Sequence, residues 1–555
     1  MKQHSHRNWS NWGLASLVWA ASACSSPGTP PPASRDAGKA DVVETMATGG
    51  APATDVHVGS TGGAANMGGA FSTGGVTSAG GNSGAGGHSE SSGATGGSGG
   101  PTFPEAGTRD ASTPSPDTGS DTGPDAAPDS ARSDARDVVV TPDLAAPDAP
   151  GADSPAVPTL TTLPSKATVL EAIRRANDYF TGLHSDPTQD IVTDKTRPSN
   201  LWTRAIYFEG LMGLYGIEPD ATRKSSDYDY AVRWAASPSH PWAMANTAAS
   251  TMTNNADNQA CGQTYIDLYQ IDAKAERIAV VKVNIDDMVA KGTANVWTWI
   301  DDIQMAMPVF VRLGVVTSDT RYFDAMWALY NDARTKQGGG LYNPADGLWW
   351  RDLHFTPGGG SQQKMTAALN SAMPASGTDA NIVSPNGKSM YWSRGNGWVM
   401  AALVRVLDLL PASDSHRAQY IADLQAMAAA LLPIQRSDGF WNESLLDPTQ
   451  CSAIGLAGQD GPETSGTALF AYGLAWGIRK GVLDTSTYAQ ALSSAWNGLA
   501  TVALQSNGLV GYVQSTGDRP CTDSAALGPT KVANFDDYGV GAFLLAGSEV
   551  FRLAN

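Results

Sequence analysis

Tryptophan and tyrosine are absent from a long stretch near the beginning of the chain. The 555-residue sequence has 16 residues of each type, and none of them lies in residues 20–178. Residues 25–160 are mostly Gly, Ser, Thr, Ala, Pro and Asp. Such a stretch cannot bury enough apolar surface to offset the entropy that is lost when it becomes ordered. The absence therefore excludes a packed domain there and predicts a disordered linker over 25–160, followed by one large folded unit over 165–555.

Basic residues are also scarce, since 36 Lys and Arg stand against 54 Asp and Glu, for a net charge of −18. The predicted linker has 16 acidic and 5 basic residues, and the chain after residue 160 has 38 and 29. Binding to duplex nucleic acid depends on Lys and Arg that neutralise phosphates. This balance argues against nucleic acid as a partner, and a polyanionic substrate would have to be met locally by one or two arginines.

Histidine and cysteine are too few, and too widely spaced, to indicate a metal site or a Ser/His pair. No CxxC is present, and the glycine-rich runs in 49–100 follow no strand and precede no helix, so they do not form a dinucleotide loop. We expect neither a metal nor a cofactor. The histidines after residue 160 are His184, His240, His354 and His416.

The first 24 residues resemble an export signal. Lys2 and Arg7 precede a short apolar run that is too short for a membrane span, and the run ends in Ala21-Ser-Ala-Cys24. A cysteine there, before a long flexible stretch, resembles a bacterial lipoprotein signal in which Cys24 is lipidated, although Ala21 stands where such signals more often have Leu. We expect an exported protein, anchored by lipid at the cell envelope or, alternatively, periplasmic or secreted. Contact with a membrane would come only through this anchor.

The other three cysteines would then lie in an oxidising compartment. Cys451 and Cys521 lie in loop-like sequence and could pair with each other. Cys261 begins an apolar run, so we expect it to be a buried free thiol.

From about residue 165 the apolar pattern is helical, with almost no alternation of the strand type. Amphipathic helices alternate with runs that are apolar nearly all round, as in helices buried on every side. The amphipathic segments include 168–183, 318–335, 415–432 and 485–504. The apolar runs begin with Trp202–Gly210, Asp257–Gly262, Trp299–Asp302, Trp392–Trp398, Glu463–Gly466 and Asp536–Gly539.

Outer amphipathic helices that alternate with inner buried ones predict an all-α (α/α)6 toroid, and an open bundle is the alternative. The parallel inner helices would bring their N-termini to one face, where the aligned helix dipoles favour anionic groups. The long insertions 336–388 and 438–462 would build the walls of that face. We expect the functional pocket there.

The strongest motif in these helix heads is Trp299-Ile-Asp301-Asp302, which continues to Met305 and Pro308. Two adjacent carboxylates in an apolar helix are costly to bury and point about 100° apart, so they cannot share one role. The i, i+4, i+7 spacing places Asp301, Met305 and Pro308 on one stripe, which favours Asp301 as the residue that faces the pocket. The alternative is that both acids cap the helix N-terminus.

Four motifs in order along the chain resemble glycoside hydrolase families 88 and 105, the unsaturated glucuronyl and rhamnogalacturonyl hydrolases. They are 299–308 (WIDDIQMAMP), 347–352 (GLWWRD), 392–398 (WSRGNGW) and 463–473 (ETSGTALFAYG). The likeness covers most of residues 165–555, and the third motif is the most specific. It implies an (α/α)6 barrel that removes a 4,5-unsaturated uronic acid from the non-reducing end of lyase-generated oligosaccharides by hydration of the C4=C5 vinyl ether.

The resemblance also implies roles for residues. Asp301 would be the general acid/base, and Asp257 would be the second carboxylate that sets its pKa and orients the substrate, although Asp257 taken alone is more typical of a helix cap. Asn396 and Trp398 are expected to be structural. Trp349 and Trp350 are expected in the pocket wall or in the core. The expected substrate contacts are Trp299, Met305, Trp350, Arg351, Trp392 and Arg394.

Arg351 departs from the family pattern, in which a His often occupies this place, and His354 follows three residues later. Arg351 is expected to pair either with a second acidic group of the substrate or with Asp352. We predict a hydrolase of unsaturated uronides from pectin of the rhamnogalacturonan type, with an oligosaccharide as its partner. The alternatives are an (α/α)6 glycosidase of saturated glycosides and a surface glycan-binding lipoprotein. The oligomeric state is not predicted.

Overall fold

The structure is a computed structural model that describes residues 158–193, 195–248, 252–292, 296–357, 383–523, 526–530 and 537–555. The predicted signal with Cys24, residues 25–157 of the predicted linker, and Asp536 lie outside these ranges.

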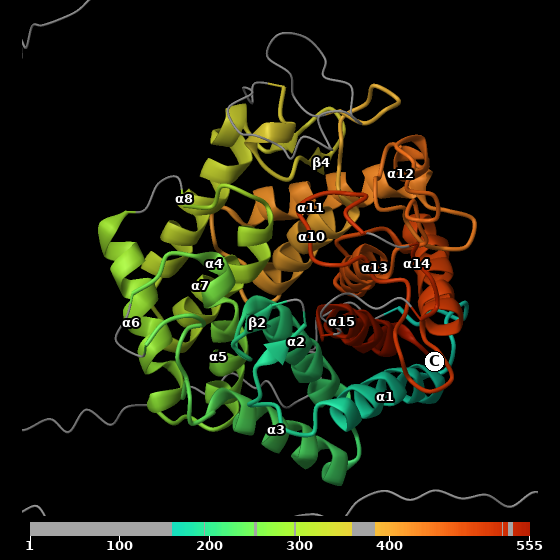
Figure 1. The fold of residues 1–555 in the computed structure, drawn as a ribbon. Coiled ribbons are helices and arrows are strands. Elements are labelled where there is room, and N and C mark those ends of the chain that lie inside the picture. The colour runs from blue at the N-terminus through green and yellow to red at the C-terminus, as the bar shows by residue number, and fades with distance from the viewer. Residues whose placement is uncertain are drawn as a thin grey trace, which may run out of the picture. The chain divides into compact units, whose positions relative to one another are not determined.

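Six inner helices of the described chain form a closed ring (Figure 1). Each inner helix contacts the next in chain order, and the last one, α15, contacts the first one, α2. The predicted (α/α)6 toroid is therefore confirmed, and the open bundle is excluded. The inner helices are α2 (Trp202–Ile217), α5 (Cys261–Ile271, preceded by the short α4, Ala256–Gln259), α7 (Asp301–Thr317), α10 (Ser393–Leu407), α13 (Thr464–Arg479) and α15 (Asp537–Leu553).

The outer helices alternate with the inner ones along the chain and pack against them (Figure 1). Their buried side chains follow one face, as the amphipathic pattern predicts. They are α1 (Lys166–Leu183), α3 (Ala221–Ala235), α6 (Glu276–Lys291), α8 (Arg321–Thr335), α11 (Arg417–Leu431) and α14 (Thr485–Gly498), which continues as the π-helical turn η4 (Leu499–Ala503).

Two glycines form the seam where the ring closes. A Cβ added to Gly210 of α2 would lie 2.4 Å from the carbonyl oxygen of Gly541, and a Cβ added to Gly541 of α15 would lie 2.2 Å from that of Ile206. Real Cβ atoms do not approach so closely. The glycines at these helix heads thus allow the first and last inner helices to touch backbone to backbone.

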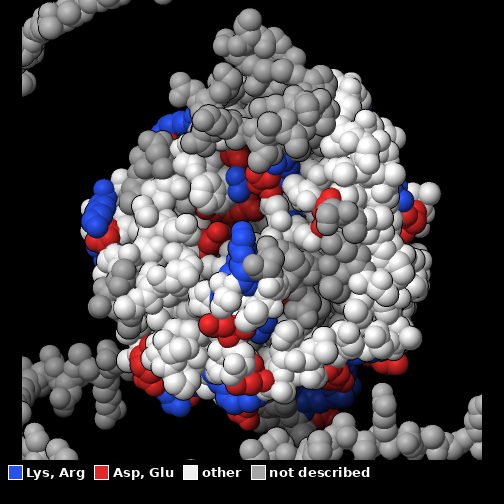
Figure 2. Space-filling view, in the orientation of Figure 1, with Lys and Arg blue, Asp and Glu red and all other residues white. Residues whose placement is uncertain are grey.

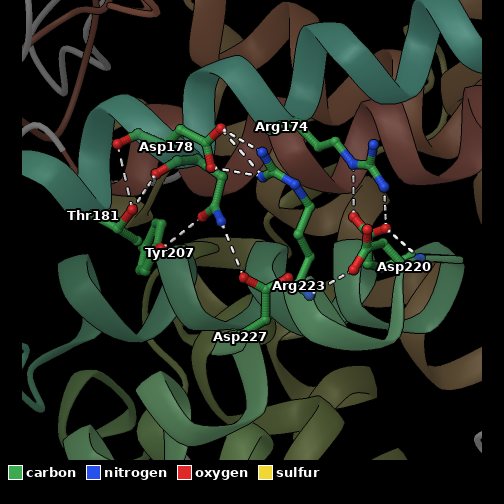
Figure 3. Close-up of polar contacts among 9 residues, drawn as sticks. Arg174, Asp178, Thr181, Tyr207, Asp220, Arg223 and Asp227 are labelled. Atoms are coloured by element: carbon green, nitrogen blue, oxygen red, sulfur yellow. Dashed lines mark hydrogen bonds and ion pairs between the residues drawn. The ribbon is translucent and has the colours of Figure 1, made fainter. Parts of the chain in front are cut away.

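Polar contacts dock the outer helices α1 and α3 on each other (Figure 3). Arg223 of α3 donates to Asp178 of α1 at 2.9 Å, and Asn177 of α1 donates to Asp227 of α3 at 3.2 Å. The hydroxyl of Tyr207, from the inner helix α2, donates to Asn177 at 2.8 Å. Burial, with Glu218 and Asp178 nearby, raises the pKa of Asp227 to about 7.

Short elements lie between the helices. β1 (Ile191–Val192) pairs antiparallel with β2 (Thr196–Arg197), and β3 (Tyr342–Asn343) pairs with β4 (Leu348–Trp349), with Asn343 opposite Leu348. The remaining pieces are η1 (Gln337–Gly339), η2 (Leu353–Phe355), η3 (Leu432–Ile434) and α12 (Gln450–Ala453). None of the described helices is long and apolar enough to cross a membrane.

The cysteine predictions are confirmed. Cys451 and Cys521 form a disulfide with their Cα atoms 5.2 Å apart, and Cys261 is a buried free thiol. The disulfide joins α12 to the loop before α15, 70 residues later in the chain.

Candidate active site

Three carboxylates come together where α4 and α7 begin. Asp257 lies in the first turn of α4, and Asp301 and Asp302 are the first two residues of α7. The negative charge of Asp301 acts on Asp257, and that of Asp257 acts on Asp302. Figure 2 views the ring of helices face on. It shows acidic and basic side chains gathered in a hollow at the centre of the ring.

Asp302 supports the turn that leads into α7. Its side chain is buried, and its Oδ2 accepts hydrogen bonds from the backbone N–H of Thr298 at 3.0 Å and of Trp299 at 3.4 Å. Asp301 accepts neither of these hydrogen bonds, and 14% of its side chain is exposed. The two adjacent acids therefore differ in surroundings, as the sequence predicts. The alternative that both acids cap the helix N-terminus is wrong, because α7 begins after Ile300 without a side-chain cap and the N–H groups bound by Asp302 belong to residues before the helix.

Burial raises the pKa of all three carboxyl groups. The pKa of Asp257 rises to about 6, because burial and then the charge of Asp301 disfavour its ionised form. Burial also raises the pKa of Asp301, against the opposing positive charge of Arg351. For Asp302, burial followed by the charge of Asp257 raises the pKa well above its usual range. The cluster thus favours carboxyl groups that retain a proton above the normal titration range of Asp.

Asp257 is not the cap of α4, because the Asn255 side chain accepts the backbone N–H of Asn258 there. Among the described residues, none donates a hydrogen bond to the half-buried Asp257 carboxylate. The cap role that the sequence left open for Asp257 is wrong, and its carboxylate is available to a ligand. Its role as the partner of Asp301 stays a prediction.

Arg351 is the basic group in direct contact with this cluster. Its Nε donates to Asp301 Oδ2 at 3.2 Å, and its Nη1 donates to Asp352 Oδ2 at 2.7 Å. The guanidinium carbon lies 5.2 Å from the centre of the half-buried Trp299 ring, a cation–π distance. Pairing between residues far apart in sequence places it there, since Ile300 N–H donates to the Arg351 carbonyl at 2.9 Å. Of the two predicted partners, Asp352 is in contact.

Trp392 and Arg394, which the sequence assigns to sugar contacts, are buried in the structure. Arg394 donates to the carbonyl oxygens of Gln514 at 2.9 Å and Ser515 at 2.8 Å, and its guanidinium lies between the rings of Trp392 and Tyr538. The indole N–H of Trp392 donates to the Gln514 side chain at 2.7 Å. These contacts anchor the loop around Gln514 to the head of α10. A sugar contact by either residue stays a prediction.

Met305 and Trp350 are also buried, 1% and 6% exposed. The buried Trp350 ring lies 5.7 Å from that of Tyr391, so both Trp349 and Trp350 belong to the core. Asn396 binds the backbone of Trp349 through both its oxygen and its nitrogen, at 2.9 and 3.0 Å, which confirms the structural role expected for it. Substrate contact by Met305 and Trp350 stays a prediction.

Sequence reasoning missed Arg197 and the groove beside it. Arg197 follows the turn between β1 and β2, and its charge lowers the pKa of Asp257, which places it near the carboxylates. The groove has a volume of about 360 Å³ and is lined by Arg197, Asn200, His240, Met244 and Asn246, among others. The segment before the first inner helix contains no motif that could have indicated this groove.

Glu443, Cys451 and Cys521 are near enough to one another to suggest a metal site within the described chain. The two sulfur atoms are bonded to each other as a disulfide, so they offer no thiolate. This set of residues therefore does not fit a metal ion.

The sequence model of Glycosyl Hydrolase Family 88 matches residues 172–369 and 372–554 of the chain. A protein of Formosa agariphila named unsaturated 3S-rhamnoglycuronyl hydrolase is 33% identical over 267 residues, which cover 48% of this chain and 61% of that protein. A protein of the same name from Alteromonas sp. is 30% identical over 258 residues, which cover 46% of this chain and 51% of that protein. The match thus spans less than two thirds of either relative. A solved structure of a glycosyl hydrolase family 88 protein from Bacteroides vulgatus is 29% identical, with a TM-score of 0.56 and coverage of 70% of this chain and 100% of that one.

Proposed function

Because this chain belongs to glycosyl hydrolase family 88, we propose that it is a hydrolase that removes a 4,5-unsaturated uronic acid from the non-reducing end of an oligosaccharide. The observation that carries the proposal is the pair Asp301 and Asp257. One is a partly exposed carboxyl group with a raised pKa, and the other is a half-buried carboxylate that no described residue holds by a hydrogen bond.

In this proposal Asp301 acts first as an acid and then as a base. Its proton goes to C4 of the C4=C5 double bond, which leaves an oxocarbenium ion at C5 and the ring oxygen. Water then adds to C5 and gives a proton back to the Asp301 carboxylate. The product of this addition is a hemiketal at C5 of the sugar. The hemiketal opens and the aglycone is released. A carboxyl group whose pKa lies closer to neutrality can serve in both directions.

Asp257 would bind the substrate and keep the pKa of Asp301 from falling. Trp299, half-buried beside Arg351, offers a flat apolar surface to the half-chair ring of the unsaturated sugar. The groove lined by Arg197, whose charge acts on Asp257, would take the sugar that follows the uronate. Its lining of amide, hydroxyl and guanidinium groups suits the hydroxyl groups of a sugar.

For the substrate we propose a uronic acid followed by rhamnose, as in pectin of the rhamnogalacturonan type. The names of the Formosa and Alteromonas relatives speak of a rhamnoglycuronyl group, which supports rhamnose in the second position and leaves the uronate and the polymer to be tested. Two preparations distinguish them: rhamnogalacturonan and a rhamnoglucuronan, each digested with its lyase.

The test is the loss of ultraviolet absorbance of the conjugated double bond when the full chain is added to either digest. We expect loss with at least one digest, and faster loss with the rhamnogalacturonan products. Activity on the rhamnoglucuronan products alone would overturn the pectin assignment. No loss with any unsaturated uronide would overturn the reaction; release of sugar from saturated glycosides, or binding without turnover, would then support a different glycosidase or a glycan-binding protein.

We also propose that the protein is exported and attached to the cell envelope through a lipid on Cys24. The support is the sequence of residues 1–24. Fractionation of expressing cells should find the protein with membranes, and Cys24→Ala should move it to the soluble fraction. An unchanged distribution would contradict the anchor.

A further inference from the structure

Arg351 has one fixed and one looser acidic partner. The contact with Asp352 is 2.7 Å, whereas the contact with Asp301 is 3.2 Å. Asp352 is itself held, because its Oδ1 accepts the backbone N–H of His354 at 2.9 Å and lies 2.8 Å from His354 Nδ1. The Trp299 ring, whose centre lies 5.2 Å from the guanidinium carbon, adds a second contact that does not involve Asp301. Arg351 would therefore stay in position if its ion pair with Asp301 were broken.

The guanidinium also has room for a ligand. The Arg351 side chain is 20% exposed, and no described residue accepts a hydrogen bond from its Nη2. A planar guanidinium with a free edge binds a carboxylate through two parallel hydrogen bonds.

The contact with Asp301 conflicts with the proposed chemistry. A carboxyl group that donates a proton to C4 must be protonated, whereas an ion pair with Arg351 favours the ionised form. The positive charge of Arg351 is the largest effect that opposes the rise in the pKa of Asp301. In the free protein, the ion pair thus opposes the protonation of Asp301 that the reaction requires.

We propose that Arg351 is a positioning residue that changes partners: it holds Asp301 in the free protein, and the carboxylate of the substrate uronate displaces Asp301, which then takes up a proton. The inference rests on the proposed function and names a step that precedes the chemistry. Acid activation would be coupled to the arrival of the negative group that marks the substrate.

The other charges around Asp301 and Arg351 favour this exchange. Asp257 of α4 and Asp302 of α7 repel a negative charge on Asp301. They therefore favour its protonated form once Arg351 is paired with the substrate. Arg394 of α10 also acts on Asp301, but it is buried and bound to backbone carbonyls. Arg351 also interacts with the negative charges of Asp352 and Asp518, and Asp257 interacts with the positive charge of Arg197. When the substrate carboxylate enters and Asp301 gains a proton, the charge of the cluster does not change.

The exchange predicts that one proton is taken up when an anionic sugar binds. The probe is a saturated uronic acid, either glucuronate or galacturonate, which has the carboxylate but no double bond to react. Calorimetric titration of the full chain near neutral pH, in two buffers with different heats of ionisation, counts the protons. We expect close to one proton per uronate bound to the wild type, and none for Asp301→Asn.

Variants of Arg351 separate the exchange from a structural role. Arg351→Gln should bind uronate at least about tenfold more weakly and take up no proton, because its Asp301 is already protonated. Arg351→Lys should bind weakly but restore proton uptake, since it keeps the charge without the planar fork. Arg321→Gln removes an exposed guanidinium that pairs with Asp319 at the start of the outer helix α8, and it should behave as the wild type.

No binding of uronate by the wild type, binding without proton uptake, or proton uptake that persists in Arg351→Gln would each overturn the proposal. Turnover of unsaturated uronide together with such a result would leave the proposed function standing and remove only the exchange. Proton uptake without turnover of any unsaturated uronide would do the reverse.

Discussion

Two groups of buried charges lie along the ring, and they are built differently. At the helix heads, the described residues bond one cation to the three acids Asp257, Asp301 and Asp302, and this cation, Arg351, contacts Asp301. Deeper in the ring lies a second group, here called the axial cluster, formed by Glu209, Asp267, Arg312 and Arg405 from α2, α5, α7 and α10. The heads have an excess of acid, whereas the axial cluster has as many cations as carboxylates.

In the axial cluster, each carboxylate lies beside an arginine of the same cluster. Arg312 donates to Asp267 at 2.7 Å, and Arg405 lies 3.5 Å from Glu209 and 3.7 Å from Asp267. It borders a cavity of about 140 Å³ that side chains from all six inner helices line. A buried cluster whose charges are balanced is costly to break, because the removal of one member leaves its partner buried without a counter-charge. At the heads, Asp301 is partly exposed and no described residue donates a hydrogen bond to Asp257, so acids with a raised pKa are available to a ligand there, which is why the heads are the candidate for catalysis.

Removal of one acid from each group should separate activity from stability, and this is the largest effect that we expect. Asp301→Asn should lower the rate constant for turnover of unsaturated uronide by about 10³-fold or more, because general acid–base catalysis is lost. Asp267→Asn should leave turnover near the wild-type rate at temperatures where the variant is folded, but lower its unfolding temperature. The absorbance assay and thermal unfolding measure the two effects.

Asp302→Asn is the matched control at the heads. Asparagine keeps an oxygen that can accept the N–H bonds of Thr298 and Trp299, so the turn should survive with a smaller loss of activity. A dead Asp302→Asn beside an active Asp301→Asn would reverse the assignment of the acid.

The sequence predicted the ring of helices and the residues of the acid cluster. It predicted less well the contacts that these residues make with distant parts of the chain. Apolar periodicity located the starts of the six inner helices and four of the six outer helices, α1, α8, α11 and α14, to within a few residues. α8 begins at Arg321 instead of Ser318, because Ser318 adopts a left-handed conformation that ends α7. Spacing along one helix also predicted that Asp301 and Asp302 have different surroundings, because adjacent residues in one helical turn point in different directions.

Contacts between distant segments were beyond such patterns. Arg351 reaches Asp301 across 50 residues, and no periodicity links the two positions. Trp392 and Arg394 look like sugar contacts in their motif, yet Gln514 and Tyr538, from segments more than 100 residues away, enclose them. A motif shows which residues belong together, whereas burial depends on what the rest of the chain places over them.

Loss of the Arg405 cation should have the second-largest effect, on stability alone. Arg405→Met keeps much of the side-chain volume but leaves Glu209 and Asp267 without this partner. Removing one member of a buried pair costs about 3–5 kcal/mol in the free energy of unfolding. Urea denaturation measures the loss, with Arg321→Met on the surface of α8 as a control that should show no change. A loss as small as that of the control would mean that the axial cluster does not depend on its charge balance.

The smallest effect that we expect concerns the proton on Glu209. Burial raises its pKa to about 7 from an ordinary value of 4.5, although Arg405 opposes the rise. Between these two values the folded protein holds a proton that the unfolded chain has lost, so stability falls as the pH rises from about 4.5 to about 7. The fall attributable to this group is at most about 3 kcal/mol.

Glu209→Gln carries no titrating group at this position. Its free energy of unfolding, followed by urea denaturation across this pH range, should therefore fall less steeply than that of the wild type. Asp227 and Asp257 titrate in the same window in both proteins, so the difference between the two curves isolates Glu209. Parallel curves would mean that Glu209 is ionised beside Arg405 throughout, and the axial cluster would then be fully charged as well as balanced.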